Sequence, residues 1–138
     1  MKARLQSVES FTMFEINNEL HYCRKIPDHP GYYASTQGDI ISAKGTEPSV
    51  MLTQDNGRGY RYTNLFTAGR PIKRYVHRLV AAAFLQAPDA DPKGNLRKEV
   101  NHLDSNPSNN RVSNIEWSSS SENKLHAHMM KGVRNAQI

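Results

Sequence analysis

The last third of this 138-residue chain is organised around the run Val100-Asn-His-Leu-Asp-Ser-Asn-Pro-Ser-Asn-Asn-Arg-Val-Ser-Asn-Ile-Glu-Trp117. Apolar residues near both ends of this run predict two short strands, Glu99–Leu103 and Ile115–Trp117, separated by a loop of mostly Asn, Ser and Asp. Ser119 and Glu122 follow with the spacing of a capping box, which predicts a helix that Gly132 closes. The expected order is therefore strand, loop, strand and helix.

This C-terminal unit is small, and a unit of that size buries little apolar surface by itself. We expect Trp117, Leu125 and Met129 to form its core, with further stabilisation from packing on the rest of the chain. The stretch Ala87–Gly94 contains two prolines and a glycine, so it is the best candidate for a linker. The sequence therefore predicts two parts, residues 1–92 and residues 93–138.

The N-terminal part is predicted to be rich in β-strands. Turn residues at 26–31 precede a hairpin formed by Tyr32–Thr36 and Ile40–Ser42. Two further strands, Ser49–Gln54 and Tyr60–Thr67, flank an Asp-Asn-Gly turn at 55–57, and a short strand is expected around Ser10–Ile16. Apolar residues at helical spacing predict one helix near 75–86, which Pro88 stops; they are Val76, Leu79, Val80, Ala83 and Phe84. The predicted fold class is α+β.

Composition narrows the classes of partner and compartment. The formal net charge of +5 favours a polyanionic partner, above all nucleic acid. No apolar run approaches the roughly 18 residues needed to span a bilayer, and the N-terminus lacks the pattern of a signal peptide. Cys23 is the single cysteine, which excludes a disulfide within the chain and a zinc site that needs two thiolates. A reducing cytoplasm is the expected compartment.

The segment from Asn56 to Pro88 contains no Asp or Glu, and aromatic residues are interleaved with its cations. A run of charges is usually only a solvated face, yet the complete absence of acids over this length favours contact with DNA phosphates. Alternate residues of the Tyr60–Thr67 strand, or the Gly69–Arg74 turn, could enter a groove. The predicted DNA-binding residues are Arg58, Arg61, Arg70, Lys73, Arg74, Arg78 and, in the C-terminal helix, Lys124.

The C-terminal pattern resembles that of the HNH nuclease family, most of all its short members encoded by phages and mobile introns. The residues that carry the resemblance are Asn-His-x-Asp at 101–104, Asn-Asn-Arg-x-x-Asn-Ile-x-Trp at 109–117 and Glu-Asn at 122–123. A more diffuse likeness extends upstream, through Ile26-Pro-x-x-x-Gly-Tyr32 and Val76-His-Arg-Leu-Val-Ala81. The resemblance implies that the strand–strand–helix unit is the ββα-metal motif, also called the His-Me finger, of an enzyme that cleaves DNA.

The resemblance also implies a role for four side chains. His102 would be the general base, since an imidazole with a pKa near 6.5 is largely neutral at pH 7 and accepts a proton from water. Asn101 and Asn123 would be the metal ligands, and the Asn114 amide would hold the long loop and so orient the base. Successive strand residues face opposite sides, so Asn101 and His102 reach one cleft only where the strand ends.

The metal ligands depart from the usual family pattern, which often has Asp or His at position 101 and His at position 123, sometimes with a further His at position 127. Here these positions are Asn101, Asn123 and Ala127. Two neutral amide oxygens suit Mg²⁺ or Mn²⁺, one per active site, and predict that the metal binds mainly together with the substrate phosphate. His126 could add a contact one turn further on, whereas capping and solvent exposure account for Glu116 and Glu122.

The expected function is that of a homing-type, phage-like HNH endonuclease that hydrolyses phosphodiester bonds of double-stranded DNA. One base and one metal per subunit predict a nick in one strand by a monomer or weak homodimer, in the cytoplasm of a bacterial host if a phage encodes the protein. Two alternatives remain. A restriction or defence HNH nuclease would share the site, and a non-catalytic DNA-binding protein would retain the fold with a decayed site.

Overall fold

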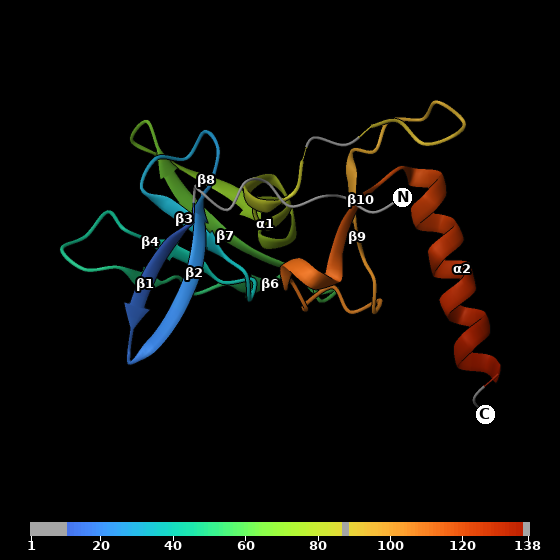
Figure 1. The fold of residues 1–138 in the computed structure, drawn as a ribbon, viewed down its shortest axis with the longest axis horizontal. Helices are drawn as coiled ribbons and strands as arrows, with labels where there is room; N and C mark the ends of the chain where they lie inside the picture. Colours follow the sequence, from blue (N-terminus) through green and yellow to red (C-terminus); the bar gives the residue numbers. More distant parts are fainter. Residues whose placement is uncertain (1–10, 87–88, 137–138) are drawn as a thin grey trace.

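The computed structural model describes residues 11–86 and 89–136 and has the predicted α+β character (Figure 1). Its N-terminal strands form an antiparallel sheet of five strands, each paired with its neighbour along the chain. The predicted hairpin is present, because Tyr33 pairs with Ile41 across a turn that contains Gly38 at φ +91°. The strands are β1 (Thr12–Ile16), β2 (Glu19–Lys25), β3 (Tyr32–Ser35), β4 (Ile40–Ser42) and β5 (Ser49–Val50).

A second antiparallel sheet contains β6 (Gln54–Asp55), β7 (Arg61–Thr67) and β8 (Arg70–Tyr75). The predicted turn between β6 and β7 forms because the Oδ1 atom of Asp55 accepts hydrogen bonds from the backbone N–H groups of Gly57 and Gly59 at 2.6 and 3.0 Å. These bonds, led by the one from Gly59, hold the pKa of Asp55 below its usual value. The sheet therefore ends in a well-ordered turn directed toward the C-terminal region, where Gly59 meets Pro107.

The helix α1 (Val76–Phe84) lies in the middle of the molecule, between the β-rich region and the C-terminal strands (Figure 1). It matches the predicted helix near 75–86, although the predicted stop, Pro88, lies outside the described residues. Buried side chains of both predicted parts join a single hydrophobic core around the helix; they include Ile40, Leu65, Val80, Phe84, Val100 and Ile115. The division at residue 92 stays a prediction.

The C-terminal region begins with β9 (Glu99–His102), which pairs antiparallel with β10 (Ile115–Ser118), and ends with α2 (Ser120–Ala136). A short 3₁₀ turn, Val112–Asn114, leads into β10. Both the strand–strand–helix order and the helix start agree with the prediction. Both helices contact this hairpin: α1 packs against it through the core residues Val100 and Ile115, and α2 is its second neighbour. Neither helix of the described residues has the length and apolar character needed to cross a bilayer.

Two strand predictions in the N-terminal region were wrong. Ser49–Gln54 is not one strand: its first residues pair with β4 and its last residue begins β6, because the segment passes from one sheet to the other. The predicted Gly69–Arg74 turn is mostly the strand β8. The turn consists of Ala68 and Gly69 alone, both at positive φ, and Pro71 is tolerated because β8 is an edge strand.

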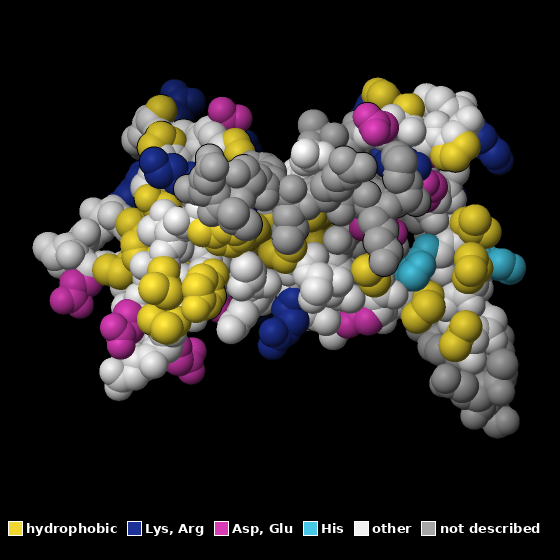
Figure 2. All heavy atoms as spheres, viewed as in Figure 1, with side chains coloured by type: hydrophobic (Ala, Val, Ile, Leu, Met, Phe, Trp, Pro, Cys, Tyr) yellow, Lys and Arg dark blue, Asp and Glu magenta, His cyan; other side chains and the backbone are white. Residues whose placement is uncertain are grey.

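Two predictions for the C-terminal helix were also wrong. Gly132 does not close α2, which continues to Ala136, since a glycine inside a helix costs only about 1 kcal/mol. Leu125 and Met129 do not form a core: their exposed fractions are 59% and 60%. The helix extends past the edge of the hairpin, and Figure 2 shows a row of exposed hydrophobic side chains along it. Of the three residues predicted to form the core, Trp117 alone packs against the hydrophobic cluster.

Candidate active site

His102 is the last residue of β9 and is 6% exposed. Its Nε2 atom lies 2.8 Å from Oδ1 of Asn110, in the loop that follows the strand. Its ring is surrounded by two others: the centroid of His77 lies at 5.3 Å and that of Tyr60 at 6.0 Å. The imidazole is therefore held in one orientation by a polar partner and by aromatic packing.

His77, on α1, is the nearer of the two ring neighbours. Burial, followed by the charges of His102 and Arg78, lowers the pKa of His77 to about 4. The His77 ring is therefore neutral at physiological pH and adds no positive charge beside His102. No pattern along the chain predicted the contact of His77 with His102.

The amide of Asn114 ties the two ends of the long loop together. Its Nδ2 atom donates to Oδ1 of Asp104 at 2.9 Å and to the carbonyl oxygen of Asn109 at 2.8 Å, and its Oδ1 atom accepts from the Asp104 backbone N–H at 3.1 Å. The Asp104 carboxylate also accepts a hydrogen bond from the Asn109 side chain. This bond is the largest cause that lowers the pKa of Asp104. Asn114 therefore has the loop-holding contacts that its position in the motif implies.

Asn101 and Asn123 each have a carboxylate partner. Nδ2 of Asn101 donates to Oε1 of Glu116, its neighbour across the hairpin, at 3.3 Å, and Nδ2 of Asn123 donates to Oε1 of Glu99 at 2.9 Å. With each nitrogen engaged in this way, the amide oxygens are the atoms left for a cation. The sequence assigned Glu116 no role in the site, but in the structure Glu116 holds the candidate ligand Asn101. Glu99 holds Asn123 in the same way.

A cavity of about 350 Å³ joins these side chains. Asn101, His102 and Asn123 all line it, because the strand ends at His102 and the cavity extends around that end. Asn114 does not line it and acts at a distance, through the loop. The other residues that line the cavity include Tyr60, Glu99, Ser105, Lys124 and His126.

The cavity suits a hard divalent cation shared with a phosphate better than a fully enclosed metal site. Within the described residues, no group of three or more His, Cys, Asp or Glu side chains is placed to hold a metal. The amide oxygens of Asn101 and Asn123 are hard donors, and the cavity leaves room beside them for phosphate and water oxygens. His126 lines the same cavity one turn after Asn123, and its Nε2 atom is buried without a hydrogen-bond partner in the described residues.

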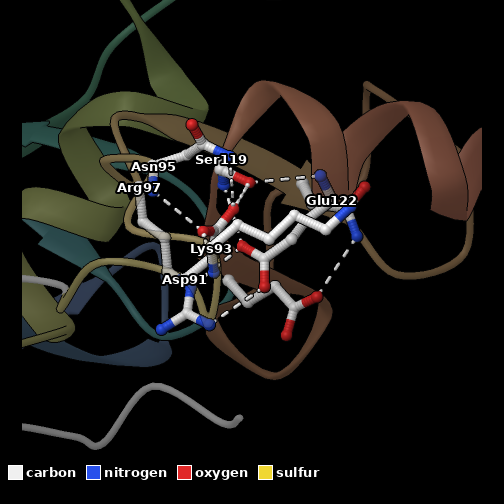
Figure 3. A network of polar contacts seen from close by, with 8 residues as sticks. Asp91, Lys93, Asn95, Arg97, Ser119 and Glu122 are labelled. Atoms are coloured by element: carbon white, nitrogen blue, oxygen red, sulfur yellow. Dashed lines mark hydrogen bonds and ion pairs between the residues drawn. The ribbon is translucent and has the colours of Figure 1, made fainter.

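A polar network fixes the start of α2, and with it the position of Asn123 (Figure 3). The predicted capping box is present: Glu122 N–H donates to Oγ of Ser119 at 3.2 Å, and Ser119 N–H donates to Oε1 of Glu122 at 2.9 Å. The Ser119 hydroxyl also donates to Oδ2 of Asp91 at 2.7 Å, and Arg97 donates to both carboxylate oxygens of Glu122 at 2.9 Å. The start of the helix is thus bound to the segment before β9.

The network keeps both of its carboxylates ionised. The hydrogen bond from Ser119 is the largest cause that lowers the pKa of Asp91 to about 2, and the one from Arg97 is the largest cause that lowers the pKa of Glu122 to about 2. Burial opposes both shifts. The sequence predicted the capping box but not Asp91 or Arg97, whose partners lie some 25 or more residues further along the chain.

The cations predicted to bind DNA lie in different surroundings. Arg61 is tied to Thr53 through the Thr53 Oγ1 and carbonyl oxygens, at 3.0 and 2.5 Å, and Arg78 donates to the Lys98 carbonyl oxygen at 2.9 Å. Lys73 lies over the Tyr62 ring, 4.2 Å from its centroid. The remaining predicted cations are exposed on the surface; they are Arg58, Arg70, Arg74 and, beside the cavity, Lys124.

Comparison with known proteins agrees with this geometry. Residues 74–125 match the family model described as HNH endonuclease, a range that runs from the end of β8 to the second turn of α2. The chain belongs to the HNH endonuclease family, which confirms the predicted relationship.

Some of the similar proteins are named as homing endonucleases. The chain is 34% identical over 115 residues, 83% of its length, to YosQ of Bacillus subtilis (strain 168), a prophage protein named among HNH homing endonucleases. It is 29% identical over 121 residues to HNH endonuclease L247 of Acanthamoeba polyphaga mimivirus. The solved structure of the HNH homing endonuclease I-HmuI, described as showing DNA binding and cleavage, superposes over 83% of the chain with a TM-score of 0.61 and 27% identity.

The chain spans only part of each of these proteins. It covers 61% of YosQ, 28% of L247 and 63% of the I-HmuI chain. The family match, residues 74–125, includes Asn101, His102 and Asn123 but not Tyr60, His126 or Ala127, which also line the cavity.

Proposed function

We propose that this protein is a metal-dependent HNH endonuclease that hydrolyses phosphodiester bonds of DNA. The observation that carries the proposal is the meeting of His102, Asn101 and Asn123 at one cavity, because these are the side chains that the family pattern assigns to the base and the metal. The cavity opens beside Lys124 and near the start of α2, where positive charge favours a phosphate.

His102 supports the chemistry as the general base. It removes a proton from a water molecule whose oxygen then attacks the phosphorus atom; the bond from phosphorus to the 3′-oxygen breaks, and that oxygen leaves with the electron pair of the bond. Protonation of the 3′-oxygen by solvent completes the balance. The products are a 5′-phosphate and a 3′-hydroxyl. The tight packing around the His102 ring favours this role, since a base acts efficiently when its orientation is fixed.

Asn101 and Asn123 would hold Mg²⁺ or Mn²⁺, through oxygens that Glu116 and Glu99 leave free by engaging the amide nitrogens. When bound, the ion supplies positive charge that stabilises the phosphate and the leaving oxygen as charge develops. Both ligands are neutral. The negative charge near the metal would therefore come from the carboxylates of Glu99 and Glu116, each of which is hydrogen-bonded to one of the ligand amides. We expect metal affinity to be low without DNA.

The homing-type assignment rests on the names of the relatives, YosQ and I-HmuI. One candidate base, His102, at this cavity of the described residues favours a nick in one strand, by a monomer or weak homodimer, in the cytoplasm of a bacterial host if a phage encodes the protein. A restriction or defence nuclease would have the same site and differ in target choice. Mapping of cut sites on a phage genome separates the two, since a homing enzyme cuts at few positions.

The second alternative, a DNA-binding protein with a decayed site, is favoured by the neutral side chains at 101 and 123. The test is incubation of supercoiled plasmid with the protein, with Mg²⁺ or with a chelator. We expect nicked circles with Mg²⁺ alone, and a fall of about 10²–10⁴-fold in rate for His102→Ala, the usual effect of a general base.

His128→Ala is the matched control, because His128 is exposed on α2 and does not line the cavity. It should nick plasmid at the rate of the unaltered protein. Plasmid left intact by the unaltered protein under every metal condition, or equal nicking by His102→Ala, would contradict the proposed function.

A further inference from the structure

The loop between β9 and β10 is supported by two turns that lie far away in the sequence. The β6–β7 turn contacts it at Gly59, whose carbonyl oxygen accepts from the Ser108 hydroxyl at 2.6 Å. The β3–β4 turn contacts it at Thr36, whose carbonyl oxygen accepts from the Val112 N–H at 3.0 Å. The loop that carries the partner of His102 is therefore held against the β-rich region.

The contact at the β3–β4 turn is closest at Gly38. This residue has φ +91°, and a Cβ atom on it would lie 2.6 Å from both the carbonyl carbon and the carbonyl oxygen of Asn110. Real Cβ atoms do not approach backbone so closely, so only glycine leaves Asn110 where it is. The backbone position of Asn110 is thus set by the turn.

The Asn110 side chain has one hydrogen-bond partner among the described residues, the imidazole of His102. Asn110 is 5% exposed and does not line the cavity, so it does not touch a substrate there. Its Oδ1 atom lies 2.8 Å from Nε2 of His102, and an amide oxygen only accepts. In the neutral ring, Nε2 then carries the proton, and Nδ1 keeps its lone pair and makes no hydrogen bond with the described residues.

We propose that Asn110 is a positioning residue which, supported by the β3–β4 turn at Gly38, fixes the tautomer of His102 so that Nδ1 is the nitrogen that acts as base. The rings of His77 and Tyr60 limit rotation of the imidazole, and Asn110 selects which nitrogen bears the proton. The consequence for catalysis rests on the proposed function, whereas the tautomer itself does not.

The first test measures the tautomer directly, by ¹⁵N NMR of the His102 ring at a pH where it is neutral. We expect a single Nε2–H form in the unaltered protein and a mixture of both tautomers in Asn110→Leu, which removes the acceptor. Asn110→Asp, which keeps an oxygen at that place, should restore the Nε2–H form. An Nδ1–H form in the unaltered protein, or an unchanged signal in Asn110→Leu, would overturn the proposal.

The second test uses the glycine. Gly38→Ala should displace Asn110 and give the same mixture of tautomers, even though the side chain of Asn110 is intact. Gly69→Ala is the matched control, because Gly69 also has positive φ (+77°) but no atom within 4 Å of the added Cβ. The control carries the same backbone strain and should retain the Nε2–H signal. Equal spectra for Gly38→Ala and Gly69→Ala would show that the turn does not set the position of Asn110.

The third test links the tautomer to activity. In plasmid nicking, Asn110→Leu should lower kcat by about tenfold or more and leave KM for DNA within about twofold, with recovery in Asn110→Asp, because a base in the wrong tautomer fails at the chemical step. Loss through KM alone would contradict a positioning role. If the protein nicks no DNA at all, the proposed function fails, while the tautomer result still decides the assignment of Asn110.

Discussion

His77 does not line the cavity, but its ring packs against the rings that surround the candidate base. Its ring lies against three others, with centroids at 5.3 Å for Tyr60 and His102 and at 5.7 Å for Tyr75. The Nδ1 atom is buried and has no hydrogen-bond partner among the described residues. Burial, followed by the charges of His102 and Arg78, disfavours a protonated ring in this place, so the pKa of His77 falls to about 4.

The pH dependence of stability follows from this shift. In the unfolded chain His77 takes up a proton as the pH falls through about 6.5, whereas in the folded protein it does so only near 4. The unfolded state therefore binds more protons between these values, and stability is lost as the pH falls from 6.5 toward 4. Replacement by Phe removes the titration and keeps the aromatic packing.

We expect His77→Phe to reduce the loss of stability between pH 7.5 and pH 4.5, by up to about 3 kcal/mol. Urea unfolding at several pH values measures it. His128→Phe, at an exposed position of α2, should keep the full pH dependence of the unaltered protein. A His77→Phe curve parallel to that of the unaltered protein would mean that the His77 pKa is not depressed by folding.

Candidate residues at the site were predictable where the motif has fixed spacing, and not where they depend on register or packing. His102, Asn114 and Asn123 were named from the resemblance of their motif to the HNH family pattern. The pairing of Asn101 with Glu116 depends on the register of the β9–β10 hairpin, which no local pattern specifies. The contact of Asn110 with the His102 ring, 2.8 Å between Oδ1 and Nε2, likewise depends on the path of the loop and not on a local pattern.

At the scale of elements, α2 is positioned by its first turn. Most of its remaining length is exposed, so the capping box and the bond from Ser119 to Asp91 do much to fix the direction in which the helix presents Asn123. The start of α2 was predictable because a capping box is local in sequence. Its end at Ala136 was not, because no residue after Gly132 terminates it by a local rule.

Ser119→Ala should lower the free energy of unfolding by about 1 kcal/mol, because the helix loses its capping side chain and Oδ2 of Asp91 loses one of its hydrogen-bond donors. Chemical denaturation at pH 7 measures it. Ser121→Ala is the matched control, an exposed serine in the first turn of the same helix, and should change stability by less than about 0.5 kcal/mol.

The effect of Ser119→Ala should also depend on pH. Asp91 and Glu122 have folded-state pKa values of about 2, below their values in the unfolded chain, so the stability they contribute is complete above about pH 4.5 and is lost as the pH falls toward 2. The difference between the unaltered protein and Ser119→Ala should shrink over that range. A difference that stays constant down to pH 2 would show that the network does not depend on ionised carboxylates.

At the scale of the whole molecule, the β-rich region and the C-terminal hairpin act as one body around α1. The core joins residues from Ile26 to Ile115. The loop beside His102 is hydrogen-bonded to turns of both N-terminal sheets. The α+β class was predictable from strand and helix signals. The way the sheets enclose the loop was not, because these contacts join residues about 50 to 75 positions apart.

One face of the three-stranded sheet packs against the core, and the opposite face is exposed to solvent. Thr63 and Leu65 of β7 are buried, whereas the alternate residues on both strands form an exposed surface. Lys73 is the cation on that surface, over the ring of Tyr62 and beside Tyr75. The surface also contains Asn64, Phe66 and Pro71, which pair with one another or with Lys73 across the strands. We propose that this open strand face, with a cation and several aromatic rings, is the surface that lies along DNA.

Lys73→Ala should therefore weaken DNA binding and reduce the slope of log K against log salt by about one, the effect of one lost phosphate contact. Lys25→Ala removes an exposed lysine from the five-stranded sheet and is the matched control, with an unchanged slope expected. Arg61→Ala is informative in another way: its guanidinium is bound to Thr53, so the change should lower stability more than it alters the salt slope. A salt slope that falls for Arg61→Ala and not for Lys73→Ala would contradict the proposed DNA-facing surface, because the two side chains emerge from opposite sides of the strands.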